Sequence, residues 1–139
     1  MKPSKREAVA GWAASGGLGV RHMVPVVASA SRPNGEPYSY ARSGEFLLVT
    51  DDRAVIAIAT VQGRFNKSID VTHGDSLRLQ DICNVRARTV TEMQIPTAVM
   101  FDIPPVTYQF ILDTHEEADS EGTIRQFMAL IEFLNSNTN

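Results

Sequence analysis

The chain has 139 residues, of which 43% are hydrophobic and 21% charged, and its formal net charge at pH 7 is −3. This composition is typical of one soluble globular domain, and the longest apolar stretches are far shorter than the roughly 20 residues of a membrane helix. The negative charge is concentrated in residues 113–139, which hold six acidic residues and one basic residue. No region is basic enough to indicate nucleic-acid binding.

Cys83 is the single cysteine, so the chain can form neither an intrachain disulfide nor a cysteine-based zinc site. We expect a buried, inert thiol, because a free cysteine behaves as a small hydrophobic residue. Residues 28–30 are typical of a signal-peptide cleavage site. However, Arg21 and His22 interrupt the apolar segment that a signal peptide needs. We therefore expect a cytoplasmic protein.

A capping box predicts a short helix near the beginning of the chain. Ser4 and Glu7 are three residues apart, the spacing at which both side chains satisfy free N–H groups at a helix start. This predicts a helix over residues 5–14, ended by the glycines that follow. Because Trp12 makes this segment apolar, we expect it to pack on the rest of the chain or on a neighbouring subunit.

Runs rich in β-branched residues predict strands through the middle of the chain. Pro33, Asn34 and Gly35 supply turn residues between two of them. Pro25 lies within the first run, and because proline lacks an N–H for a sheet ladder we expect an edge strand or a strand start there. Eight segments predict six or seven short antiparallel strands: residues 23–30, 45–50, 54–61, 66–72, 76–82, 84–93, 97–103 and 106–112.

The segments 45–50 and 54–61 are joined by Asp51, Asp52 and Arg53, which predicts a hairpin. Two interpretations of this acidic connection are open. One is a catalytic pair of carboxylates. The other is a turn with Asx-type hydrogen bonds and an arginine–aspartate pair, and we favour this structural interpretation.

The clearest helix is the last one. Its apolar residues recur at a helical spacing and predict a stripe that faces the core, with Asp119 or Ser120 as the N-cap. Short antiparallel strands followed by one amphipathic helix predict an α+β fold, mainly β, in which the helix closes a curved sheet or split barrel. The stripe consists of Ile124, Phe127, Met128, Ile131 and Leu134.

These elements resemble the bacterial pleckstrin-homology-like (PH-like) domains. The resemblance rests on "LVTDDR" at residues 48–53 between two strands, on "LRLQDICNV" at residues 77–85, on "FDI" and "YQFIL" in the last strands, and on the closing helix. It covers roughly residues 23–135. It implies an antiparallel seven-stranded split barrel capped by a C-terminal amphipathic helix, with residues 23–139 as the domain and residues 1–22 as a preceding segment.

The resemblance does not carry a lipid-binding function to this chain. Lipid-binding members place several Lys and Arg residues in the loop between the first two strands, where they hold inositol phosphates. The matching loop, residues 31–44, has only Arg32 and Arg42, alongside Glu36. Bacterial relatives are often adaptors, and some assemble into rings, which implies a protein-binding role.

No pattern typical of catalysis is present. His22, His73 and His115 have no partners at a spacing that forms a site, and no G-x-S-x-G motif occurs. Gly-rich residues 16–19 lack the Lys-Ser/Thr of a phosphate loop. Residues 113–121 are the best metal candidate, but acidic residues are also favoured before a helix. We expect no enzymatic activity, no metal and no cofactor.

The expected binding residues are Trp12 and a modest basic patch. The patch would dock an acidic partner or the acidic tail of a neighbouring copy. The alternative is ordinary surface charge. The patch consists of Arg64, Lys67, Arg78, Arg86 and Arg88.

We therefore expect a non-catalytic module that binds a protein or peptide, acts as a scaffold or self-assembles, without nucleic acid. A sheet edge or the groove between the last helix and the sheet is the expected contact, because extended peptides commonly add to open edges. The alternatives are a peripheral lipid-binding module, which the sparse basic loop disfavours, and a structural subunit of a larger assembly such as a phage or secretion complex.

Overall fold

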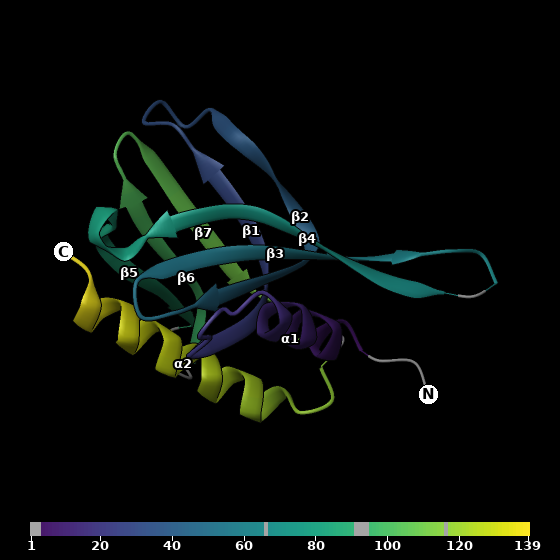
Figure 1. Ribbon diagram of the computed structural model, residues 1–139. Helices are drawn as coiled ribbons and strands as arrows, with labels where there is room; N and C mark the ends of the chain where they lie inside the picture. The colour runs from purple at the N-terminus through teal and green to yellow at the C-terminus, as the bar shows by residue number, and fades with distance from the viewer. Residues whose placement is uncertain (1–3, 66, 91–94, 116) are drawn as a thin grey trace.

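The computed structural model describes residues 4–65, 67–90, 95–115 and 117–139 (Figure 1). These residues form an antiparallel seven-stranded sheet with the strand order β4-β3-β2-β1-β7-β6-β5 and a helix from each end of the chain packed on it. The predicted fold class, α+β and mainly β, is confirmed. The elements are α1 (Lys5–Ser15), β1 (His22–Ser31), β2 (Pro37–Val49), β3 (Arg53–Gln62), β4 (Ser68–Arg78), the 3-10 turn η1 (Leu79–Asp81), β5 (Cys83–Val90), β6 (Ile95–Ile103), β7 (Val106–Leu112) and α2 (Ser120–Asn137).

The predicted segments 66–72 and 76–82 belong to one strand, β4, and to the turn η1 that follows it. The pairing of β3 with β4 shifts register between Val55 and Ala57, so Gly74 lies at an irregularity within the strand. A Cβ atom at Gly74 would lie 2.9 Å from the carbonyl oxygen of Ile56, which explains why this position is a glycine. Asn66 and the end of the predicted strand 84–93 lie outside the described residues.

The expectation for Pro25 is wrong, because β1 lies between β2 and β7 in the middle of the sheet. Pro25 pairs with Phe46 of β2, and its carbonyl oxygen accepts a hydrogen bond of 3.0 Å from the N–H of Asp113. The last β1–β7 pair is Val26 with Leu112. The missing N–H of Pro25 therefore lies at the end of the β1–β7 ladder. There it removes one hydrogen bond but does not interrupt the hydrogen bonds between β1 and β7.

The two faces of the β2–β3 hairpin enter two different hydrophobic cores. Leu47 and Ile56 enter the first core, which lies between the sheet and α2. Phe46, Leu48 and Val55 alternate with them and enter the second core, which lies between the sheet and α1. Because both faces are covered, the hairpin strands are almost continuously apolar rather than alternating.

Helix α1 packs on the sheet of its own chain. Val9 and Ala13 are buried in the second core, and Trp12 is half-buried against it, with its ring 6.2 Å from the ring of His73. The predicted cap is confirmed, since the hydroxyl of Ser4 accepts a hydrogen bond of 3.1 Å from the N–H of Glu7. Trp12 is therefore part of the fold.

Helix α2 closes the first core. Phe127, Leu130 and Leu134 are fully buried there, and Asp119 is the N-cap, with its carboxylate accepting from the N–H of Gly122 at 2.9 Å. The expectation that Met128 faces the core is wrong, since it is 48% exposed. The buried stripe runs through Leu130 instead of Met128, because Phe127, Leu130 and Leu134 lie on one face of the helix. Met128 therefore lies on the neighbouring face and points towards solvent.

The acidic connection between β2 and β3 is a turn, as predicted, but Thr50 organises it. Its hydroxyl oxygen accepts a hydrogen bond of 3.0 Å from the N–H of Arg53. The predicted arginine–aspartate pair within the connection is wrong, because Asp51 pairs with Arg21 of the segment before β1. Arg53 instead donates to the hydroxyl of Ser76 at 3.1 Å.

His22 links β1 to α2. Its ring lies 5.4 Å from the ring of Phe133, and the guanidinium of Arg21 lies 5.3 Å from the same Phe133 ring. Burial lowers the pKa of His22 below its ordinary value of 6.5, and the charge of Arg21 lowers it further.

Replacing Leu48 by alanine tests the second core. Because Leu48 is fully buried under α1, we expect the free energy of unfolding to fall by about 2–5 kcal/mol. Urea denaturation measures the change, with Val61→Ala at a half-exposed position as the control. A loss no larger than that of Val61→Ala would contradict the packing of α1 on this face.

The lowered pKa of His22 predicts a pH-dependent stability. Between that pKa and about 6.5 the unfolded chain binds more protons than the folded one, so the free energy of unfolding rises with pH through this window and is constant below it. Urea denaturation between about pH 5 and pH 7 should show this rise, and His22→Gln should reduce it. His115→Gln, at an exposed position, should retain it; equal loss in both variants would contradict the assignment.

Candidate functional site

The five residues of the predicted basic patch do not form one surface. Arg64 and Lys67 lie in the connection between β3 and β4, at the end of a hairpin that projects away from β5 (Figure 1). Arg86 and Arg88 lie on β5, the outer strand on the other side of the sheet. Arg78 ends β4 and forms an ion pair of 3.0 Å with Asp81.

Strand β5 presents a free edge. Among the described residues it is bonded to β6 on one side and to no strand on the other. The start of this edge is occupied by Asn139, two residues after the end of α2. The N–H of Asn139 donates to the carbonyl oxygen of Ile82 at 3.1 Å, and the N–H of Asn84 donates to the main-chain oxygen of Asn139 at 3.1 Å.

The side chain of Asn139 strengthens this attachment by donating to the carbonyl oxygen of Gln80 at 3.0 Å. Its two backbone bonds skip Cys83, which is the pattern of a parallel strand pair. The edge of β5 therefore already accepts extended backbone. Sequence reasoning missed this contact, because no local pattern relates residue 139 to residue 83. Cys83 itself is half-buried, so the expectation of full burial is wrong.

Asp102 of β6 holds the start of β5 in place. Its carboxylate accepts from Asn84 Nδ2 at 3.0 Å, from Thr107 Oγ1 at 2.8 Å and from the guanidinium of Arg86 at 3.4 Å. Asn84 has a left-handed backbone with φ 56°, and the β5–β6 register shifts between Cys83 and Arg86. This network stabilises the irregular backbone that turns the N–H of Asn84 towards Asn139.

Burial alone would raise the pKa of Asp102. The hydrogen bonds from Asn84 and Thr107 and the charge and hydrogen bond of Arg86 outweigh it, so the pKa lies below its ordinary value of 3.8. Arg86, predicted as a binding residue, therefore has a structural partner, whereas Arg88 is exposed.

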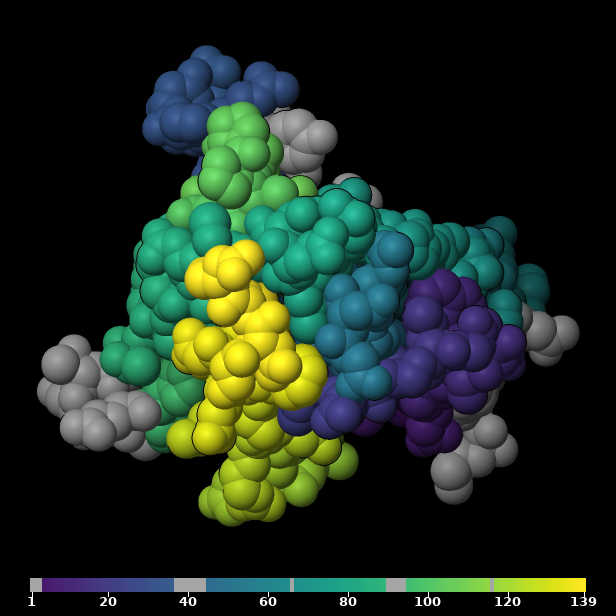
Figure 2. Space-filling view, turned by 60° about the vertical axis from the view of Figure 1, so that its left-hand side comes forward, coloured from purple at the N-terminus to yellow at the C-terminus, as the bar shows by residue number. Residues whose placement is uncertain are grey.

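An open groove of about 320 Å³ lies between β5, β6 and α2. Met128 and Ile131 of α2 form one wall, and Ala87 of β5 forms the other. Glu132 is the charged residue among those that line the groove in the described part of the chain. In Figure 2 the last turns of α2, in yellow, lie beside the green surface of this part of the sheet. The full lining is Ala87, Thr89, Pro96, Met128, Ile131, Glu132, Asn135 and Ser136.

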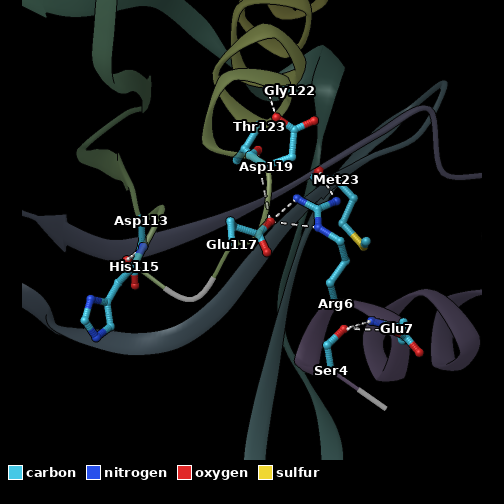
Figure 3. A network of polar contacts seen from close by, with 10 residues as sticks. All are labelled: Ser4, Arg6, Glu7, Met23, Asp113, His115, Glu117, Asp119, Gly122 and Thr123. Atoms are coloured by element: carbon cyan, nitrogen blue, oxygen red, sulfur yellow. Dashed lines mark hydrogen bonds and ion pairs between the residues drawn. The ribbon is translucent and has the colours of Figure 1, made fainter.

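A second cavity, of about 390 Å³, lies where α1 and α2 begin. Figure 3 shows its polar groups. Arg6 forms an ion pair with Glu117 and donates to the carbonyl oxygen of Met23 at 3.4 Å. Ser4 and Asp119 cap the two helices. These side chains join the first helix to the segment before the last one, so their polar atoms serve the fold.

The predicted metal candidate at residues 113–121 falls in this region. Glu117 pairs with Arg6, Asp119 caps α2, and Asp113 accepts the N–H of His115 at 3.0 Å. Residue 116 lies outside the described residues. Within the described ones, no three His, Cys, Asp or Glu side chains are placed to hold a metal ion.

The three histidines lie apart. His22 contacts Phe133, His73 contacts Trp12, and His115 is exposed in the connection before α2.

In the part of the chain that the structure describes, neither helix combines the length and the apolar composition that crossing a membrane requires. A search with the sequence finds no match among protein-family models or curated proteins.

Replacing Asp102 by asparagine tests the network at the start of β5. We expect a loss of about 1–3 kcal/mol at neutral pH, because the variant removes a charged acceptor from three donors. Because the pKa of Asp102 is lower in the folded chain than its ordinary value of 3.8, its carboxylate stabilises the fold fully above pH 3.8. This contribution is lost as the pH falls through the lowered pKa.

Urea denaturation at neutral and acidic pH measures both effects, with Asp75→Asn at an exposed position of β4 as the control. Equal stability of the Asp102→Asn variant and the unmodified chain at neutral pH would contradict the role of Asp102.

Proposed function

We propose that this chain is a non-catalytic protein-binding module with a PH-like fold. The strand order β4-β3-β2-β1-β7-β6-β5 supports the fold, since it leaves β4 and β5 as the outer strands of a bent sheet. Helix α2 packs on the inner face of that sheet, as the capping helix of a split barrel would. The motifs at residues 48–53 and 77–85 correspond to the turn before β3 and to the passage from β4 to β5.

The proposed binding site is the free edge of β5 together with the groove beside α2. The observation that carries the proposal is the pairing of Asn139 with Ile82 and Asn84, because it places extended backbone on this edge through main-chain hydrogen bonds. A bound segment would add to the rest of the strand in the same way. Main-chain bonds would supply affinity, and the groove would select side chains.

The groove indicates what kind of segment fits. Met128 and Ile131 favour an apolar side chain, whose burial contributes about 1.5–3 kcal/mol. Glu132 favours a positively charged residue next to that anchor. We therefore propose an extended protein segment in which an apolar residue is flanked by Lys or Arg.

The second cavity supports a non-catalytic role. Its carboxylates and its arginine already serve as helix caps and as an ion pair between α1 and the segment before α2. Each of these contacts therefore has a structural role, either in capping a helix or in holding α1 against the segment before α2. The predicted basic patch contributes little to the proposal, because its residues lie on separate parts of the molecule.

Selection from a library of random peptides displayed on phage tests the proposal. We expect selected peptides to share an apolar residue flanked by basic residues and to bind the purified chain. Met128→Lys should weaken their binding at least about tenfold, a loss of about 1.4 kcal/mol, because it places a positive charge in the groove.

Ala129→Lys is the matched control. It adds the same charge at the next residue of α2, which is exposed and does not line the groove. Peptides should bind this variant and the unmodified chain equally. The proposal fails if no peptide is enriched, or if the selected peptides bind the Met128→Lys variant as tightly as the unmodified chain.

A further inference from the structure

The end of the β3–β4 hairpin projects from the body of the molecule (Figure 1). Strand β2 pairs with β3 only as far as Ile58, whereas β3 and β4 remain paired up to Gln62 and Ser68. Beyond Ile58 the sheet is therefore reduced to two strands. We call residues 60–65 and 67–70 the arm.

Ile69 at the base of the arm packs against the second core, and the described residues beyond it, 60–65 and 67–68, are exposed. An isolated two-stranded hairpin is at best marginally stable in water, because it buries little apolar surface. Phe65 lies 88% exposed in the connection at the end of the arm, and Val61 is 49% exposed. Arg64 and Lys67 flank Phe65 and are also exposed. The arm thus presents an aromatic side chain between two positive charges.

The groove beside α2 has the complementary properties. Its wall includes Met128, another large apolar side chain that is about half exposed, and its charged lining residue is Glu132. Phe65 in this groove would cover Met128, and Arg64 and Lys67 would lie near the carboxylate of Glu132. Both exposed apolar side chains would then be buried in one contact.

The arm cannot reach this groove within the same molecule. Figure 1 places the arm at one end of the sheet and the last turns of α2 at the other. The contact must therefore join two molecules. Because the contact uses two different surfaces, the pair still has one free arm and one free groove after it forms, one on each copy, which is a heterologous, head-to-tail arrangement.

We infer that the groove between β5 and α2 takes the arm of a second copy of this chain, with Phe65 as the anchor, so that copies associate head to tail. This inference rests on the proposed function, since it names the segment that the groove binds. The arm has the side-chain chemistry proposed for that segment, an apolar residue with Arg and Lys on either side, and it would enter the groove through Phe65 of its connection rather than as a strand added to β5.

Two surface variants and their mixture test the inference by sedimentation velocity over a wide range of concentration. Phe65→Ser removes the anchor, and Met128→Lys blocks the groove. Both side chains are exposed, so both variants should fold. We expect the unmodified chain to form species larger than a dimer as its concentration rises, and each variant alone to associate at least about tenfold more weakly.

The mixture gives the decisive result. The Phe65→Ser variant keeps an intact groove and the Met128→Lys variant keeps an intact arm, so one contact per pair remains. We expect a one-to-one complex and nothing larger. Ile111→Ser, at a 40% exposed position of β7 away from both surfaces, and Ala129→Lys should associate like the unmodified chain.

Three outcomes would overturn the inference: a monomer at every concentration, undiminished association of either variant, or a mixture that forms no complex. Sedimentation with phosphatidylserine vesicles that depends on Phe65, without association of the chain, would assign the arm to a lipid surface and also overturn it. If library peptides bind the groove while the chain stays monomeric, the inference fails and the proposed function stands. If neither peptides nor copies bind, both fail.

Discussion

The packing of α2 against the inner face of the sheet is the interaction on which the rest of the structure depends. Phe127, Leu130 and Leu134 are fully buried in the first core, together with side chains from strands on both sides of β1. Without this helix the concave face of the sheet would expose its apolar side chains to water. The same helix carries Asn139 to the edge of β5 and provides one wall of the groove.

A second layer of packing determines what the opposite face of the sheet can do. Helix α1 covers β2, β3 and the inner part of β4 through Val9 and Ala13. The β3–β4 hairpin continues past the end of the β2 pairing, so its last residues have only each other as strand partners. The exposure of Phe65 therefore follows from the sheet topology.

The start of β5 illustrates how polar groups are used in this fold. Asp102, Asn84 and Arg86 form a network around an irregular stretch of backbone, and that irregularity directs one N–H group towards Asn139. The second cavity follows the same principle, since Arg6 of α1 and Glu117 of the segment before α2 join parts of the chain that are far apart in the sequence. In both places, charged residues whose pattern in the sequence is typical of a binding or metal site instead hold the backbone in position.

The sequence by itself determined the local features of this protein: the cap at Ser4, the hairpin around residues 51–53, the strand patterns and the stripe of the last helix. These features depend on neighbours a few residues away, so periodicity and turn chemistry reveal them. Only the tertiary structure decided that Pro25 lies in a central strand, that Met128 is exposed beside a groove, that Arg64 and Arg86 lie apart and that Asn139 pairs with β5. Each of these depends on which distant segments become neighbours, and that is set by the strand order and by the burial of both faces of the sheet.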